Sequence, residues 1–172
     1  LQLETVFSDF DVKSAKTGML SNAPTIKSVR KMVKKKGLKL VVDPVMVSTT
    51  GAKLLREDAL TELELLMKNA EVITPNIREA ELLSKTKIRT ISDMQKAAKV
   101  ILKKIYPKAV LIKGGHLRGN QAVDILLTNR GFTRFQSPKV QGKKFHGAGC
   151  TFSAAITAEL AKGASLVRAV DR

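Results

Sequence analysis

Short apolar runs alternate along the chain with longer segments in which apolar residues recur every three or four positions. Continuous apolar runs are typical of parallel strands buried on both faces, and the longer segments are typical of helices that cover such a sheet. We therefore predict an α/β fold with a mainly parallel sheet. Strands are expected at 12–17, 38–42, 71–74 and 109–113, and helices at 23–36, 56–68, 76–84, 92–105, 149–162 and 166–171.

Turn and cap residues refine these boundaries. Gly37 is expected to end the first of the helices, and Ser92 or Asp93 to cap the helix at 92–105. Segments 122–127 and 132–135, around a turn at 128–131, read as an antiparallel hairpin. With no internal repeat and no linker, residues 1–172 are expected to form a single domain.

The composition narrows the class of protein. Of 172 residues, 44% are hydrophobic, which excludes a largely disordered chain. The single cysteine, Cys150, excludes an intramolecular disulfide framework and a cysteine-based zinc site. No apolar run approaches the roughly 20 residues of a membrane span. We therefore expect a soluble, cytoplasmic protein with no membrane partner.

The net charge of +16 is open to several explanations. A basic protein can have a solvated lysine-rich surface, or it can bind an anionic ligand, nucleic acid or a membrane surface. The most basic segment, 27–39, has no interleaved aromatic residues to stack on bases. A solvated helix face is therefore the favoured reading of that segment, and nucleic-acid binding is disfavoured.

Polar residues and glycines gather where the predicted strands end. Ligands of open parallel sheets bind beyond the carboxyl ends of the strands, so these segments predict a ligand site at that edge. The segments are Lys16-Thr17-Gly18, Asp43-Pro44, Thr74-Pro75-Asn76 and Lys113-Gly114-Gly115.

The segment His146-Gly147-Ala148-Gly149-Cys150-Thr151 leads into a predicted helix. Its glycines allow a ligand to approach the backbone, and the free N–H groups of a first helical turn favour an anion. The segment lacks the Gly-x4-Gly-Lys-[Ser/Thr] spacing of a P-loop. The alternative is a glycine-rich turn before a core helix, with Cys150 as a small buried residue.

Three acidic or amide side chains are candidates for metal or proton chemistry. Asp43 could hold Mg²⁺ or take a proton from a hydroxyl, or it could only form an Asx turn. Asn76 and Glu79 have the spacing of a capping box, which the local sequence favours, although the same spacing could order a metal–phosphate complex.

Two further positions have both a ligand-binding and a structural interpretation. Lys113, at the end of an apolar strand, could contact a phosphate or extend its ammonium group to solvent. Met19 follows the first glycine turn, and by itself it is better explained by packing.

In combination these segments resemble the ribokinase-like small-molecule kinases, and within them the hydroxymethylpyrimidine phosphate kinases of thiamine biosynthesis. The resemblance implies a three-layer α/β/α fold and ATP-dependent phosphorylation of hydroxymethylpyrimidine, its monophosphate or both. It spans nearly the whole chain, with the segments in family order. They are Ala15-Lys16-Thr17-Gly18-Met19-Leu20, Val42-Asp43-Pro44-Val45-Met46, Thr74-Pro75-Asn76-Ile77-Arg78-Glu79-Ala80-Glu81, Leu111-Ile112-Lys113-Gly114-Gly115-His116 and His146-Gly147-Ala148-Gly149-Cys150-Thr151.

The resemblance also implies a role for individual residues. Cys150 matches the base that activates the substrate oxygen, at a position where most ribokinase-like enzymes have an aspartate. The remaining roles follow the same matches: Gly147, Ala148 and Gly149 form the anion hole, Asp43 and Glu79 hold Mg²⁺, Thr74, Asn76, Lys113 and Gly115 contact ATP or its phosphates, and Met19 and Val45 line the pyrimidine pocket.

The sequence departs from the family pattern in two respects. Ala148 replaces the usual threonine, which retains the backbone amide and loses a hydroxyl. The family's amino-terminal strands and the rest of its final helix are missing, so we expect this chain to be part of a longer protein. A pyridoxal kinase, a kinase-like domain of a fused thiamine-pathway protein and a basic nucleic-acid-binding module are the alternatives, and a homodimer is what the family suggests.

Overall fold

The computed structural model describes residues 2–46, 55–68, 70–115, 117, 119–139 and 147–172. His116 and His146, which belong to the segments discussed above, lie outside these ranges. Within the described residues, a six-stranded sheet runs in the order β1-β2-β3-β4-β5-β6. The strands are β1 (Ser14–Thr17), β2 (Lys39–Val42), β3 (Val72–Ile73), β4 (Val110–Ile112), β5 (Gln121–Thr128) and β6 (Gly131–Pro138).

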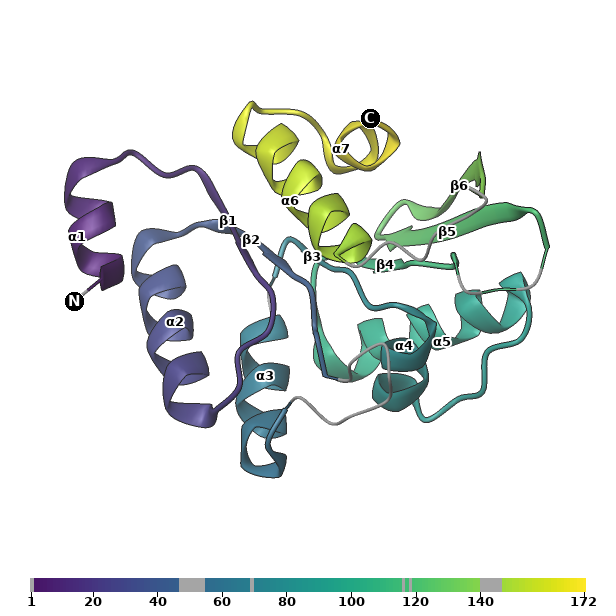
Figure 1. Cartoon of the computed structure of the whole chain (residues 1–172), viewed down its shortest axis with the longest axis horizontal. Coiled ribbons are helices and arrows are strands. Elements are labelled where there is room, and N and C mark those ends of the chain that lie inside the picture. The colour runs from purple at the N-terminus through teal and green to yellow at the C-terminus, as the bar shows by residue number, and fades with distance from the viewer. Residues whose placement is uncertain (1, 47–54, 69, 116, 118, 140–146) are drawn as a thin grey trace.

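Strands β1 to β4 are parallel, and β5 and β6 continue the sheet in antiparallel fashion. Helices cover both faces, so the predicted three-layer arrangement is confirmed (Figure 1). Helices α2 to α5 pack on one face, and α6 and α7 pack on the other. The helical segments are α1 (Gln2–Asp9), α2 (Ala23–Lys36), a 3-10 turn (Glu57–Ala59), α3 (Leu60–Met67), α4 (Ile77–Ser84), α5 (Ile91–Ile105), α6 (Ala148–Ala161) and α7 (Leu166–Asp171).

The parallel strands are apolar on both faces because each face has its own core. Val42 and Ile112 pack into the larger core beneath α2 to α5. Their neighbours Val41 and Leu111 point to the opposite face and pack with Ile156 of α6. Because successive strand residues alternate between faces, both cores require apolar residues, and continuous apolar runs result.

The hairpin is longer than the sequence predicted. Strands β5 and β6 pair from Gln121↔Pro138 to Thr128↔Gly131, which leaves Asn129 and Arg130 as the turn. Strand β6 is largely exposed, so its outer end shows no apolar pattern that could have marked it.

Helix ends follow the predicted chemistry with one correction. Gly37 ends α2 in the left-handed conformation, at φ 63°, as predicted. The N-cap of α5 is Thr90, so the prediction of Ser92 or Asp93 is wrong. Asp93 instead occupies the third helical position, where its carboxylate accepts from the Thr90 N–H at 3.0 Å and completes a capping box.

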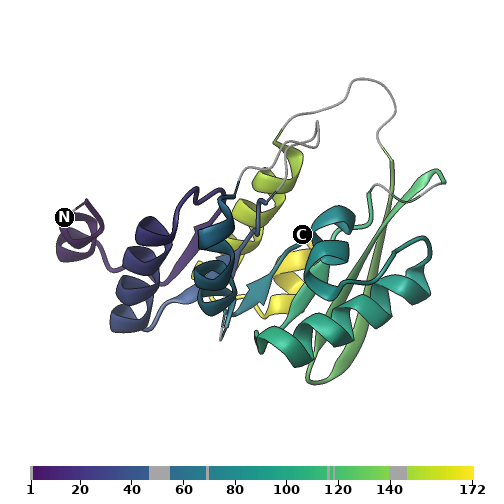
Figure 2. The ribbon, with the colours of Figure 1, turned by 90° about the horizontal axis from the view of Figure 1, so that it is seen from below.

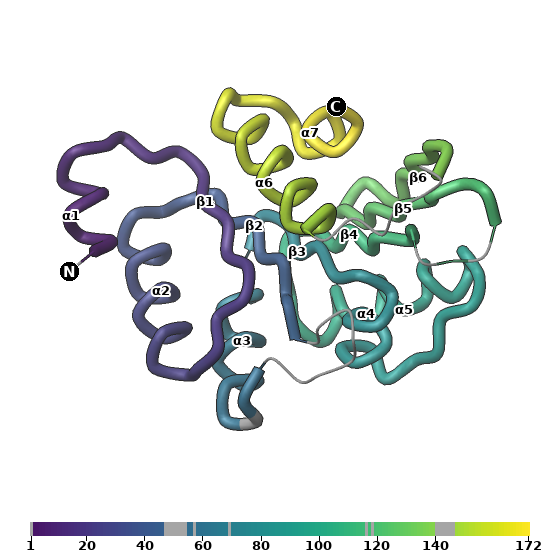
Figure 3. The backbone as a smooth tube through the Cα atoms, viewed as in Figure 1, coloured from purple at the N-terminus to yellow at the C-terminus, as the bar shows by residue number. Residues whose placement is uncertain are grey.

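Helix α1 was not predicted. It lies beyond α2 at the β1 side of the molecule (Figures 2 and 3). None of its residues is buried, and Lys36 of α2 contacts it through a hydrogen bond from Nζ to the Phe7 carbonyl oxygen at 3.3 Å and a cation–π contact with the Phe7 ring. An apolar stripe packed on the sheet, the signal used for the other helices, is therefore missing from α1.

The basic segment of the sequence forms α2 and the start of β2, and most of its charged side chains are exposed. Arg30 pairs with Glu62 at 3.0 Å. The interpretation of this segment as a solvated helix face is confirmed. In the described ranges, no helix has the length and apolar character needed to cross a membrane.

Candidate functional site

A row of polar side chains follows the carboxyl ends of neighbouring strands. Asp43, Thr74 and Lys113 come directly after the last residues of β2, β3 and β4. Each lies two positions beyond a residue packed against α6 or α7, so strand alternation directs all three side chains toward α6. The predicted convergence at this edge of the sheet is therefore present for these three residues.

The Asp43 carboxylate is the centre of this row. It is 2% exposed, and its Oδ1 lies 2.7 Å from the ammonium nitrogen of Lys113, whose side chain is 13% exposed. Thr74 donates its hydroxyl to Oδ1 at 3.4 Å, and Ser153 of α6 donates to Oδ2 at 3.3 Å. The carboxylate thus binds side chains from β3, β4 and α6, and an Asx turn does not account for it.

The first turn of α6 lies against the same lysine. Gly147 precedes the helix at φ 83°, a conformation that side chains rarely adopt, and provides no side chain to cap the helix. A Cβ atom at Gly149 would lie 3.1 Å from Lys113 Nζ, so the ammonium group contacts the helix start. An ammonium group and the free N–H groups of Ala148, Gly149 and Cys150 together favour an anion between them.

Cys150 is exposed in this first turn, so the alternative of a small buried core residue is wrong. Its carbonyl oxygen lies 3.0 Å from Ser153 Oγ and shares the single proton of that hydroxyl with Asp43 Oδ2. Ser153 is fully buried and faces both this carbonyl and Asp43. Sequence reasoning missed Ser153, although its position one helical turn after Cys150 was an available signal.

Asn76 and Glu79 form the capping box of α4 that the local sequence favoured. Asn76 Oδ1 accepts from the Glu79 N–H at 3.0 Å, and Glu79 Oε2 accepts from the Asn76 N–H at 2.8 Å. The Glu79 side chain is nevertheless buried in the site. Burial raises its pKa to about 7, the negative charge of Asp43 adds to that rise, and the Asn76 N–H and the Lys113 ammonium act against it.

Glu79 makes folding stability dependent on pH. Its pKa rises from 4.5 to about 7 on folding, so the folded state binds more protons than the unfolded chain between these values. The free energy of unfolding is therefore expected to fall as the pH rises through this window, by on the order of 3 kcal/mol in full. Urea denaturation from pH 4.5 to 8 in the presence of EDTA should show this slope in the unchanged protein and lose most of it in Glu79→Gln.

Glu64→Gln is the matched control for this measurement, because Glu64 forms an ion pair with Lys104 on the surface, 2.7 Å long. It should retain the slope. Parallel curves for the unchanged protein and Glu79→Gln would contradict the assignment.

The donor set at this edge fits Mg²⁺. Asp43 and Glu79 provide carboxylate oxygens, the ligands that this ion prefers, and both residues are 2% exposed at the same edge of the sheet. Among the described residues, no three His, Cys, Asp or Glu side chains converge as a closed metal site. Two carboxylates suit Mg²⁺, which is usually held by one or two carboxylates together with water and substrate phosphates.

The turn after β4 is tightly held. The Lys113 N–H donates to the Pro75 carbonyl at 2.9 Å and so joins the ends of β3 and β4. The Gly114 N–H donates to Asp124 Oδ1 of β5 at 2.8 Å. Gly115, also predicted to contact phosphate, is exposed beside this turn.

Sequence reasoning missed Asp124, a partly buried polar residue between the apolar Val123 and Ile125.

The two residues predicted to line a substrate pocket lie at the same edge, beyond β1 and β2. Met19 is 56% exposed, so packing does not explain it. Val45 is partly buried, and its N–H donates to the Asp43 carbonyl oxygen at 2.8 Å, which ties it to the polar row.

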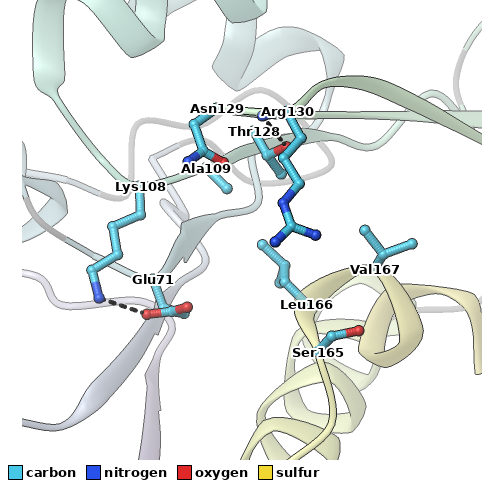
Figure 4. Close-up of a pocket in the computed structure, with 9 residues that line it drawn as sticks. All are labelled: Glu71, Lys108, Ala109, Thr128, Asn129, Arg130, Ser165, Leu166 and Val167. Atoms are coloured by element: carbon cyan, nitrogen blue, oxygen red, sulfur yellow. Dashed lines mark hydrogen bonds and ion pairs between the residues drawn. The ribbon is translucent and has the colours of Figure 1, made fainter.

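A separate pocket lies away from this edge (Figure 4). Glu71 and Lys108, which pair at 2.9 Å, line it just before β3 and β4 begin, and Arg130 of the hairpin turn points into it. It is thus at the amino ends of the strands, opposite the polar row.

Solved structures share this fold. The chain superimposes with a TM-score of 0.87 on pyridoxal kinase from Staphylococcus aureus in complex with AMP-PCP, at 37% identity, over 98% of this chain and 62% of that one. It superimposes on phosphomethylpyrimidine kinase from Clostridium difficile 630 with a TM-score of 0.83 and 42% identity, and this match covers 98% of this chain and 69% of that one. The fold is ribokinase-like, as the sequence predicted.

Curated sequences narrow the class. The chain is 43% identical over 172 residues to hydroxymethylpyrimidine/phosphomethylpyrimidine kinase from Rhizobium meliloti (strain 1021), and the match covers 99% of this chain and 64% of that protein. The phosphomethylpyrimidine kinase family model matches residues 1–172. The chain therefore belongs to the phosphomethylpyrimidine kinase family, and it spans a little under two thirds of the length of that relative.

Proposed function

We propose that the intact protein transfers a phosphoryl group from ATP to hydroxymethylpyrimidine, to its monophosphate or to both, in thiamine biosynthesis. The observation that carries the proposal is the Asp43–Lys113 pair beneath the first turn of α6, in a chain that matches the family over its whole length. The relatives' names support the same reaction.

Phosphoryl transfer requires positioning and charge neutralisation more than covalent catalysis. In the proposed mechanism, the backbone N–H groups of Ala148, Gly149 and Cys150 donate to the oxygens of the transferring group as negative charge develops there. Lys113, whose ammonium group lies beside Gly149 in the first turn of α6, contacts a phosphate of ATP. Asp43 fixes the position of the Lys113 ammonium group through their ion pair. Ser153 links the Asp43 carboxylate to the Cys150 carbonyl and so fixes the position of the first turn of α6.

Cys150 is the proposed base. Its exposed position lets the thiol reach an acceptor that enters from solvent and take the proton of the substrate hydroxyl. When the acceptor is the monophosphate, Cys150 instead orients the attacking phosphate oxygen. Met19 and Val45 are proposed to line the pyrimidine pocket.

Asp43 and Glu79 are the residues that would hold Mg²⁺, which when bound neutralises phosphate charge. Thr74, which follows β3, and Asn76, the N-cap of α4, are proposed to orient the nucleotide phosphates together with Gly115. The capping box leaves Glu79 Oε2 bonded to its own helix, so the carboxylate approaches a ligand in a fixed orientation.

Pyridoxal is the rival substrate, because the fold matches a pyridoxal kinase as well as it matches a pyrimidine kinase. ATP consumption by the intact protein should be measured with hydroxymethylpyrimidine, its monophosphate and pyridoxal. We expect kcat/KM to be at least about tenfold higher for a pyrimidine, the ratio that 1.4 kcal/mol of differential binding produces. A preference for pyridoxal would overturn the proposed substrate.

A cytoplasmic location and a homodimer remain predictions that belong to this proposal. Nucleic-acid binding stays disfavoured because the basic face of α2 is solvated and has no aromatic side chains between its lysines.

A further inference from the structure

We propose that Asp124 is a positioning residue for Lys113. Its carboxylate anchors the turn that follows β4 and flanks the lysine on the side away from Asp43. The kinetic part of this inference rests on the proposed function, whereas the anchoring of the turn does not.

The strand register brings the two residues together. The last pair of the β4–β5 ladder is Ile112↔Ile125, so the next positions along the two strands are Lys113 and Asp124. Residues opposite each other in an antiparallel pair share a face of the sheet. That face is the one beneath α6, and Asp124 lies there with Phe152 of α6 in the wall of one pocket.

The hydrogen bond from the Gly114 N–H extends the ladder by one rung. Its acceptor is Asp124 Oδ1, at 2.8 Å, in place of a backbone carbonyl. Gly114 itself presses against β5, since a Cβ atom there would lie 1.9 Å from the Val123 carbonyl oxygen. The backbone after Lys113 is therefore held against β5 by contact and by a bond to a carboxylate, a stronger type than a bond between neutral groups.

The charge of Lys113 favours the ionised form of Asp124. Burial raises the pKa of Asp124, while the Gly114 N–H and the Lys113 ammonium lower it. Lys113 is paired with Asp43 on its other side. In the strand order, Lys113 at the end of β4 therefore lies between Asp43, which follows β2, and Asp124 of β5, and the anchored turn restricts where its ammonium group can meet a phosphate.

Two substitutions separate anchoring from charge. Asp124→Ala removes the acceptor, and Asp124→Asn retains an acceptor oxygen without the charge. In the intact protein, Asp124→Ala should speed hydrogen exchange of the Gly114 amide, measured by NMR, by about tenfold and raise the KM for ATP by a similar factor with a smaller change in kcat. Asp124→Asn should keep both quantities within about threefold of the unchanged protein.

Ser165→Ala is the matched control, because it removes the N-cap of α7 and destabilises the fold at the amino ends of the strands, away from Gly114. It should leave the Gly114 exchange and the KM for ATP unchanged. If Asp124→Ala changes neither quantity, or changes Gly114 exchange without changing the KM, the positioning role is wrong. Fast Gly114 exchange in the folded, unchanged protein would overturn the anchor without any variant.

The two proposals fail separately. If the unchanged protein phosphorylates none of the three substrates, the proposed function fails, and Gly114 exchange in the variants still tests the anchor.

Discussion

Replacing Cys150 with alanine is expected to lower kcat by about 10²- to 10⁴-fold, the range typical of a lost general base, while ATP still binds. The thiol is exposed in the first turn of α6, so alanine leaves no cavity and suits the helix. The backbone N–H groups of the turn and the Asp43–Lys113 pair remain in place. Turnover with hydroxymethylpyrimidine and ATP affinity by titration are the two measurements.

Thr157→Ala provides the control on the same helix. Thr157 Oγ1 donates to the Ser153 carbonyl oxygen at 2.8 Å, two turns beyond the cysteine, and its loss should leave kcat within about twofold. Full turnover in Cys150→Ala would remove the base assignment. Loss of ATP binding together with turnover would assign Cys150 to nucleotide binding instead.

Lys113→Met is expected to lower the free energy of unfolding by about 3–5 kcal/mol, the cost of removing one partner of a buried ion pair. Methionine has a similar length and no charge, so among the described residues the 2%-exposed Asp43 carboxylate would keep only the hydroxyl donors of Thr74 and Ser153. ATP binding should weaken as well, because the phosphate contact is lost. Urea denaturation and nucleotide titration measure the two effects.

Lys108→Met is the matched control, since its ion pair with Glu71 has a similar length, 2.9 Å, but the lysine side chain is 66% exposed. Lys108→Met should lower the free energy of unfolding by no more than about 1 kcal/mol. Adding Asp43→Asn to Lys113→Met should restore part of the lost stability. Equal losses for the two single lysine variants would show that the Asp43–Lys113 pair behaves as a surface pair.

Local patterns were sufficient for most of the fold. The alternation of apolar runs predicted the strands and the covering helices, because each run must bury both of its faces in this architecture. Caps were predictable where the chemistry is local, as at Gly37 and in the Asn76–Glu79 box. Thr90 was missed because Thr90, Ser92 and Asp93 are all cap-forming residues, and only the backbone conformation selects one.

The partners of the site residues could not be read from local sequence. Asp43 meets Lys113 across 70 positions and Ser153 across 110. Ser153 and Asp124 are single polar residues within apolar stretches, a pattern equally typical of residues that face solvent. Only the register of β4 and β5 shows that Asp124 lies opposite Lys113 and can therefore act on it.

The sequence by itself determined the layered α/β fold, the edge of the sheet where polar groups converge and, through ordered motifs, the kinase family. These follow from the periodicity of side chains and from backbone chemistry, which act over a few residues. Only the tertiary structure decided that Asp43 is buried against Lys113, that Cys150 is exposed at a helix start and that Glu79 titrates near neutral pH. Burial and charge pairing depend on which strands and helices lie side by side, and that arrangement exists only once the chain has folded.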